Sequence, residues 1–411
     1  MPTENRLFRN IGSVTISGAL GGASSALFWL IAARRFPVSQ IGIAGLIASL
    51  AAVVNVLTSF GFNGAGIQNV ALRRGNGGLL LIGTSASTLF SVLGSAAVAL
   101  AILVIPGANH YDLSVLGILI VLSLLSGGAA MGAITDVVAG PLGNNWIGPF
   151  RNAVMGIFRI ALVLALPSGT HALPLACAFS LPVILTATLA TIFLAVQMKR
   201  SETEFWPDAQ QRIAFWKYSM QSFPSTVVMN ILPTAPPAIA VWIIGAKLGA
   251  VFYIDWNAFV LANLLVASAT VLGIAPEVDH RKLIQTVRRI ALLCASAMFL
   301  GGPIFLLLYG RIYFHYGWVG ISILGLSLLP YSQEQLQITS LRRVQAHSIT
   351  TRLTTTLAIG CFAGLTLGAL AGSVWAMTVG WLAATTGLLA VGTLLDKRNS
   401  RISHWFPSLQ Q

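Results

Sequence analysis

Apolar and polar residues follow one another along the chain in long blocks. Residues 12–33 and 41–62 are two apolar runs joined by a short polar turn that contains Arg34 and Arg35. A helix of about 20 residues is about 30 Å long, which matches the hydrocarbon thickness of a bilayer. The pattern therefore predicts a transmembrane helical hairpin.

The same hairpin recurs in the second half of the chain, displaced by 213 residues. Trp29 aligns with Trp242, and the residues that follow each tryptophan are three apolar residues, an alanine and a base. Ile41 then aligns with Ile254 at the start of the second run. A long-range repeat of membrane segments is typical of transporters built from two related halves. We therefore expect a parallel tandem repeat of membrane helices.

Twelve apolar blocks of spanning length can be placed, six in each half. An all-α integral membrane protein follows, with an N-terminal lobe at 1–196, a cytoplasmic linker at 197–212 and a C-terminal lobe at 213–411. The predicted spans are 12–33, 41–62, 79–104, 113–135, 147–166, 172–195, 217–245, 250–275, 290–309, 317–340, 353–371 and 373–395.

Composition agrees with this assignment. Apolar residues make up 56% of the 411 residues and charged residues only 9%, whereas about a quarter of a soluble domain is charged. Cys177, Cys294 and Cys361 all lie in apolar runs without metal-ligand spacing, so we expect neither disulfides nor a metal site, and no cofactor. The first apolar run lacks a convincing cleavage site and is read as a retained helix.

The basic residues predict the orientation. With the N-terminus inside, 19 of the 24 bases fall on the inner side; Arg34, Arg35, Lys247 and Arg311 fall outside, and Arg159 lies within a span. By the positive-inside rule, both termini and the linker are cytoplasmic. The net charge of +13 then reflects topology and contact with membrane lipids, and nucleic acid is not an expected partner.

The predicted loops favour transport over catalysis. No outer turn exceeds about eight residues, so the chain lacks a loop that could hold the acceptor of a membrane glycan-processing enzyme. The sequence also has no Walker motif and no nucleophile elbow. We therefore expect a transporter and not an enzyme.

Helix-breaking residues occur at matching positions of the two halves. Gly21 and Gly22 lie in the first span, and Pro233 and Pro236 in the seventh span fall on the same glycine-rich stretch when the halves are aligned. Transporters often have broken helices at their substrate sites, so both helices are expected to be bent or unwound and to act as gates. The alternative is that the glycines only permit close packing and the prolines only kink the helix.

Ionisable residues inside spans mark candidate sites, because a charge in the membrane costs several kcal/mol unless it is paired or wet. Arg159 lies near the middle of the fifth span, and helical periodicity places Asn152 and Gly156 on nearly the same face, with Arg151 nearby. This polar stripe suggests a cavity lining. The alternative for Arg159 is a structural ion pair.

Two acids are candidates for ion coupling. Glu334 lies in the polar inner part of the tenth span, where protonation or cation binding could differ between two access states. Asp255 lies near the start of the eighth span, where an acid close to the outer surface could simply be solvated.

The order of short motifs resembles the polysaccharide transporter family, the O-antigen and oligosaccharide flippases of the multidrug/oligosaccharidyl-lipid/polysaccharide (MOP) exporter superfamily. The resemblance covers most of the chain in loose motifs of one or two residues. The matching residues are Asn5, Phe8, Ala33-Arg34, Gly42, Phe60-Gly61-Phe62, Arg73-Arg74, Leu308-Tyr309-Gly310, Tyr313 and Leu341-Arg342-Arg343.

The resemblance implies two six-helix lobes around a central cavity that opens alternately to each side of a bacterial inner membrane. The implied cargo is an undecaprenyl-pyrophosphate-linked oligosaccharide, with a polysaccharide polymerase and assembly proteins as further partners and an H⁺ or Na⁺ gradient as the energy source. Arginine suits a pyrophosphate, and amides suit an uncharged glycan. The expected substrate-binding residues are Arg159, Arg151, Asn152, Arg34, Arg35, Asn55, Gln333 and Gln337.

Two other classes stay open. A multidrug cation antiporter of the same superfamily would need an acidic, aromatic-lined cavity, and the first span has no acid of the kind expected of many such exporters. A membrane polysaccharide polymerase would need a long outer loop, which the predicted topology lacks.

Overall fold

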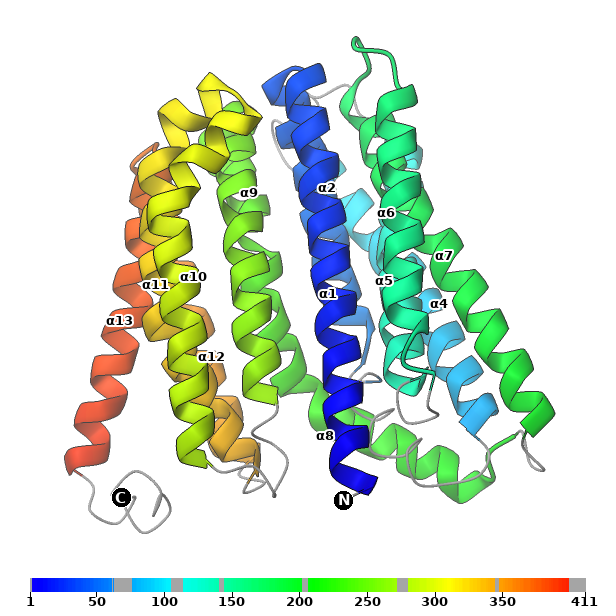
Figure 1. Cartoon of the computed structure of the whole chain (residues 1–411). Helices are drawn as coiled ribbons and strands as arrows, with labels where there is room; N and C mark the ends of the chain where they lie inside the picture. Colours follow the sequence, from blue (N-terminus) through cyan, green and yellow to red (C-terminus); the bar gives the residue numbers. More distant parts are fainter. Residues whose placement is uncertain are drawn as a thin grey trace. The chain divides into compact units, whose positions relative to one another are not determined.

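The computed structural model describes residues 2–60, 62, 76–104, 114–139, 144–201, 206–271, 280–343 and 347–398. Within these ranges the chain is all-helical (Figure 1). The helices are α1 (Pro2–Arg35), α2 (Val38–Thr58), α4 (Asn76–Val104), α5 (Val115–Ala139), α6 (Ile147–Ala165), α7 (Ala172–Ser201), α8 (Ala209–Thr234), α9 (Pro236–Val271), α10 (His280–Tyr309), α11 (Arg311–Arg343), α12 (His347–Leu370) and α13 (Val374–Arg398).

The predicted fold class is confirmed. Ten helical stretches among the described residues are long and apolar enough to cross a membrane. One of them, Thr226–Thr270, has 45 residues, enough for two crossings, and the shorter apolar helix Val374–Ala390 matches the last predicted span. These stretches account for the twelve predicted spans.

Several predicted ends were wrong because polar residues extend the helices beyond the apolar blocks. The linker expected at 197–212 is partly helical: α7 continues to Ser201, and α8 begins at Ala209. A capping box sets this start. Asp208 Oδ1 accepts a 2.6 Å hydrogen bond from the Gln211 backbone N–H, and Gln211 Oε1 accepts one of 3.1 Å from the Asp208 N–H. Similarly, α10 begins at His280, ten residues before residue 290, where the ninth span was predicted to begin.

The second hairpin is turned by one glycine. Gly245 has φ 82° and ψ 169°, a conformation available almost only to glycine, and it divides α9 into two arms. A Cβ on Gly249 would lie 2.7 Å from the Cα of Val241, although residues eight apart in a straight helix are about 12 Å apart. The arms therefore fold back on each other.

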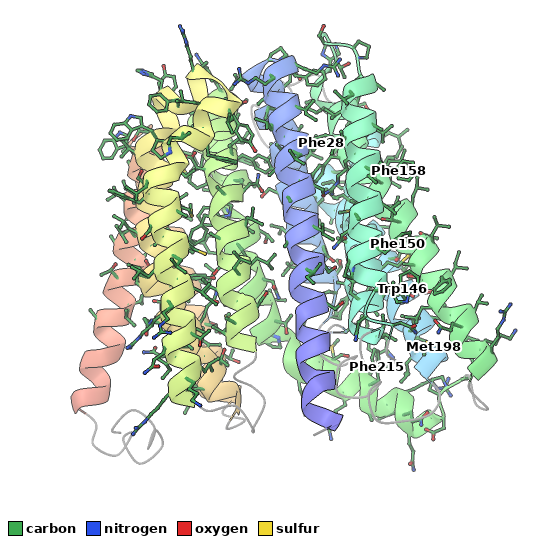
Figure 2. All side chains as sticks on the ribbon, viewed as in Figure 1. Phe28, Trp146, Phe150, Phe158, Met198 and Phe215 are labelled. Carbon is green, nitrogen blue, oxygen red and sulfur yellow. The ribbon has the colours of Figure 1, made fainter. Side chains whose placement is uncertain are left out.

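Contacts divide the chain into two compact units, Met1–Ala250 (unit 1) and Val251–Gln411 (unit 2). In unit 1, α1 packs on α6, α5 packs on α4 and α7, and α8 packs on α2. In Figure 1, α8 runs along the lower end of this unit, and Figure 2 shows Met198 and Phe215 at the same end. Both belong to a buried cluster in which the Phe62 and Phe215 rings stack with centroids 5.4 Å apart. The lobe boundary at residue 213 stays a prediction.

Unit 2 contains two tight helical hairpins. Gly310 (φ 135°) joins α10 to α11, and Gly372 (φ 72°) joins α12 to α13. The arms of the second hairpin touch through their backbones, because a Cβ on Gly364 would lie 2.3 Å from the Gly380 carbonyl oxygen. Small residues let membrane helices approach this closely.

The same helix pairs pack together in both halves. In each half, the third of the six spans packs on the fourth, the fourth on the sixth, and the fifth on the sixth. In unit 1 these pairs are α4 with α5, α5 with α7, and α6 with α7. In unit 2 they are α10 with α11, α11 with α13, and α12 with α13. This repeated packing agrees with the tandem repeat inferred from the two hairpins.

The surface of α6 shows how a spanning helix separates its faces. Trp146, Phe150 and Phe158 are each more than half exposed and lie along one side of the helix (Figure 2). Such an apolar surface suits lipid contact. The opposite face carries the polar stripe predicted from the sequence.

Candidate functional site

Arg159 is buried in unit 1 and held by Phe179 of α7. Its Nε donates a 3.0 Å hydrogen bond to the Phe179 carbonyl oxygen, and its guanidinium carbon lies 3.7 Å from the centroid of the Phe179 ring. Phe28 and Trp29 of α1 complete an aromatic cluster around this ring, with centroids 5.1 and 5.2 Å away. Figure 2 shows Phe28 beside α6. In this state Arg159 has the surroundings of a structural residue.

The rest of the stripe on α6 faces α1. Asn152 Nδ2 donates to the Ser17 carbonyl oxygen at 2.7 Å and to the Ser17 hydroxyl at 2.8 Å. A Cβ on Gly156 would lie 2.6 Å from the Ser24 Cβ. The predicted shared face is therefore present, and it forms a helix–helix contact in this structure.

Arg151 forms an ion pair with Asp136 of α5, with 2.8 Å between Nη2 and Oδ2. Glycines surround it: a Cβ on Gly132 would lie 2.2 Å from Arg151 Nη1, and one on Gly148 would lie 3.2 Å from Asp136 Oδ1. The sequence indicated Arg151 but not its partner, because the pairing depends on how α5 packs against α6.

Arg35 caps the C-terminal end of α6. It donates hydrogen bonds of 2.7, 2.7 and 2.8 Å to the carbonyl oxygens of Val163, Leu164 and Leu166. These carbonyls have no partner within the helix, and a cation is favourable there. Arg34 is exposed at the end of α1.

The first span, which was expected to be bent or unwound at its glycines, is not unwound there. α1 is one uninterrupted helix, and both Gly21 and Gly22 have helical backbone conformations. In the seventh span the helix is interrupted at Ala235, between Pro233 and Pro236. Pro236 and the following proline lack N–H donors, which explains the interruption at this point. The gating role of all four residues stays a prediction.

A groove of about 290 Å³ lies between α10, α11 and α13 of unit 2. One part is polar: Arg288 Nε donates a 3.3 Å hydrogen bond to Gln333 Oε1, and Ser332 lies beside them. The remaining lining is largely apolar, with Ala291, Leu329, Pro330, Thr386 and Leu389. Gln333 was among the expected binding residues, whereas Arg288 was counted only as a base that sets topology.

The remaining predicted amides are half-buried. Asn55 lies on α2 and Gln337 on α11, and Asn55 Oδ1 accepts no hydrogen bond from the described residues. Close to Gln337, Gln335 Nε2 donates a 3.0 Å bond to Asn263 Oδ1 of α9, so an amide pair lies inside unit 2.

Both candidate coupling acids are buried in unit 2. Glu334 is 4% exposed and Asp255 is fully buried. None of their carboxyl oxygens accepts a hydrogen bond from the described part of the chain. The alternative in which Asp255 is simply solvated does not hold in this structure, because its side chain is fully buried, and its role in ion coupling stays a prediction. The described residues contain no cluster of metal-ligating side chains.

Solved structures with the same arrangement of helices are transporters. A MOP superfamily transporter from Pyrococcus furiosus Vc1, described as having a binding pocket of reverse polarity that suggests a different function, is 16% identical, with a TM-score of 0.62 over 96% of each chain. A multidrug resistance MATE family transporter in an inward-facing conformation is 16% identical, with a TM-score of 0.60 over 98% of this chain and 96% of that one.

MATE in the straight conformation has a TM-score of 0.63 at 16% identity, over 97% of this chain and 96% of that one. No protein-family model and no curated protein matches the chain. At this level of identity the likeness concerns the fold alone, and the chain has the fold of transporters of the MOP superfamily.

Proposed function

We propose that this protein is a membrane transporter that flips a polyprenyl-pyrophosphate-linked oligosaccharide from the cytoplasmic to the periplasmic leaflet by alternating access. The fold supports transport in general. The cargo rests on the motif resemblance and on one feature of unit 2, the groove that contains Arg288.

The groove is chemically two-sided, like a lipid with an anionic head. Arg288 and Gln333 supply a cation and an amide N–H donor, which suit phosphate oxygens, whereas the Ser332 hydroxyl already donates to the Leu329 carbonyl oxygen. Leu329 and Leu389 supply an apolar wall, which suits the first isoprene units. Its volume of about 290 Å³ is sufficient for a diphosphate but not for an oligosaccharide, so the glycan would occupy other space.

The sign of the charge favours an anionic cargo over a cationic drug. The polar part of the groove contains a guanidinium group and no acid. A lipophilic cation would be repelled there and would instead need a carboxylate or an aromatic surface. The multidrug alternative depends on Asp255 and Glu334, which are both buried and do not line this groove.

The test in cells is deletion of the gene followed by analysis of lipid-linked oligosaccharides in each leaflet. The proposal predicts accumulation of the intact lipid-linked repeat unit on the cytoplasmic side and its loss from the periplasmic side. A multidrug antiporter would instead leave these lipids unchanged and increase sensitivity to cationic drugs, and that result would overturn the proposed cargo.

Arg288 and Arg289 provide a matched pair for complementation. Both are exposed bases of α10, but only Arg288 lines the groove. Arg288→Gln should complement the deletion poorly, whereas Arg289→Gln should complement it like the wild type. Equal complementation by both variants would remove the groove from the proposal.

A further inference from the structure

Asp255 occupies an enclosed niche in unit 2. A Cβ on Gly317 would lie 2.9 Å from Asp255 Oδ1, and a Cβ on Gly320 would lie 2.8 Å from Oδ2. Both carboxyl oxygens thus rest against the glycine face of α11. The side chain is fully buried, and neither oxygen accepts a hydrogen bond from the described residues.

The other atoms nearest these two glycine positions are apolar carbons. The atoms around the two glycines come from Val251 of α9, Leu306 of α10, and Val374 and Thr378 of α13. The Thr378 hydroxyl donates to the Trp375 carbonyl oxygen at 2.8 Å, so its proton is already used. No base is among these wall residues.

The titratable groups closest to the niche along α10 and α11 are tyrosines. Tyr309 of α10 lies one turn beyond Leu306, and Tyr313 of α11 lies one turn before Gly317 on the same buried face. The Tyr313 hydroxyl is also buried and makes no hydrogen bond within the described part of the chain. Arg311 and His315 of α11 are exposed, away from this face.

An ionised carboxylate would be costly in this niche. A carboxylate can accept about four hydrogen bonds, whereas glycine offers only weak Cα–H···O contacts. Burying this charge without a partner is strongly unfavourable. Protonation neutralises the carboxylate and so removes this cost, and a proton adds almost no volume to the niche.

A metal cation does not suit the niche. Hard cations take about six oxygen ligands, whereas the atoms nearest the Gly317 and Gly320 Cβ positions include only two oxygens, both from the Asp255 carboxyl group. The glycine backbone of α11 already occupies the space directly against both carboxyl oxygens. The geometry therefore favours H⁺ over Na⁺ as the ligand of this group.

We propose that Asp255 is the proton-binding site of unit 2, and that release of its proton requires Gly317 and Gly320 of α11 to move away from α9. Only then can water reach the carboxylate. The proton enters from the aqueous phase and returns to it, so the group can link a proton gradient to two packings of unit 2. This proposal rests on the proposed transport function only for its physiological role.

The proposal is tested by infrared spectroscopy of the purified protein without cargo. Aspartate labelled with ¹³C in the carboxyl group separates the C=O band of a protonated Asp255 from that of Glu334. We expect the wild type to show the band of one protonated aspartate per chain at neutral pH and Asp255→Asn to lose it completely. Asp136→Asn is the control, because Asp136 is paired with Arg151 and should not contribute.

Three outcomes would overturn the proposal: no band in the wild type, a band that persists in Asp255→Asn, or a band abolished by NaCl but not by KCl. If Asp255→Asn does not fold, Gly320→Ala provides the assignment, because its methyl group would press on Oδ2 and should shift the band frequency. An unshifted band would contradict the site. Failure of the chain to flip lipids would leave these results unchanged, so the two proposals fail separately.

Discussion

Arg159 donates a 3.0 Å hydrogen bond from Nε to the carbonyl oxygen of Phe179 and also lies over the Phe179 ring, 3.7 Å from its centroid. One residue of α7 thus satisfies a buried cation through both its backbone and its side chain. This contact stabilises a buried arginine within a spanning helix.

The contact predicts a stability defect for Arg159→Gln. A hydrogen bond from a charged group contributes about 1.5–3 kcal/mol, and a desolvated cation–π contact about 2 kcal/mol. We expect Arg159→Gln to lower the thermal unfolding midpoint of the purified protein. The midpoint of Arg159→Lys should lie between those of Arg159→Gln and the wild type. Phe179→Leu should also lower the midpoint, through loss of the ring alone. Native stability of Arg159→Gln together with loss of transport would instead indicate a role in cargo binding.

The contact between α1 and α6 predicts a second defect. The methyl group of Gly156→Ala would lie 2.6 Å from the Ser24 Cβ, so the helices must separate. Overpacking of this kind costs about 1–3 kcal/mol. Gly301→Ala is the matched control, since nothing lies within 4 Å of its Cβ position in α10. Thermal unfolding should show a lower midpoint for Gly156→Ala only; equal midpoints for both variants would contradict the packing.

The turn in α9 predicts that Gly245 cannot be replaced. Its φ of 82° and ψ of 169° would strain any residue with a Cβ by about 1–3 kcal/mol, although the space around it is open. Gly245→Ala should therefore reduce the yield of folded protein, whereas Gly387→Ala, which also has open space but lies inside helix α13, should not. Fluorescence-detected gel filtration measures both, and an unaffected Gly245→Ala would contradict this turn geometry.

The predicted orientation can be tested with single cysteines on a background in which the three native cysteines are replaced. Gly169→Cys lies in the turn between α6 and α7, which is predicted to be outside, and Gln210→Cys lies at the start of α8, which is predicted to be inside. An impermeant thiol reagent added to intact cells should label the first and spare the second. The opposite pattern would reverse the orientation.

Much of the fold could be predicted from the sequence because spanning helices are encoded by local apolar runs. The stripe of Asn152, Gly156 and Arg159 could likewise be predicted from helical periodicity. Its partners could not, since the contacts of these residues with Ser17 and Phe179 depend on which helices pack together. Burial of Asp255 could not be predicted for the same reason: its position in the sequence suggested an interface, whereas its side chain is fully buried with both oxygens against Gly317 and Gly320 of α11.

The most direct test of the proposed function uses the purified protein in vesicles that carry a polyprenyl-pyrophosphate-linked oligosaccharide in one leaflet. Appearance of the glycan in the other leaflet is followed with an impermeant lectin. We predict rapid transfer with the wild type and with Arg289→Gln, and transfer slowed about 10- to 150-fold by Arg288→Gln, which corresponds to the loss of a charged hydrogen bond of about 1.5–3 kcal/mol. The proposed function would be contradicted if the glycan moved no faster than in protein-free vesicles while the same preparation transported a lipophilic cation.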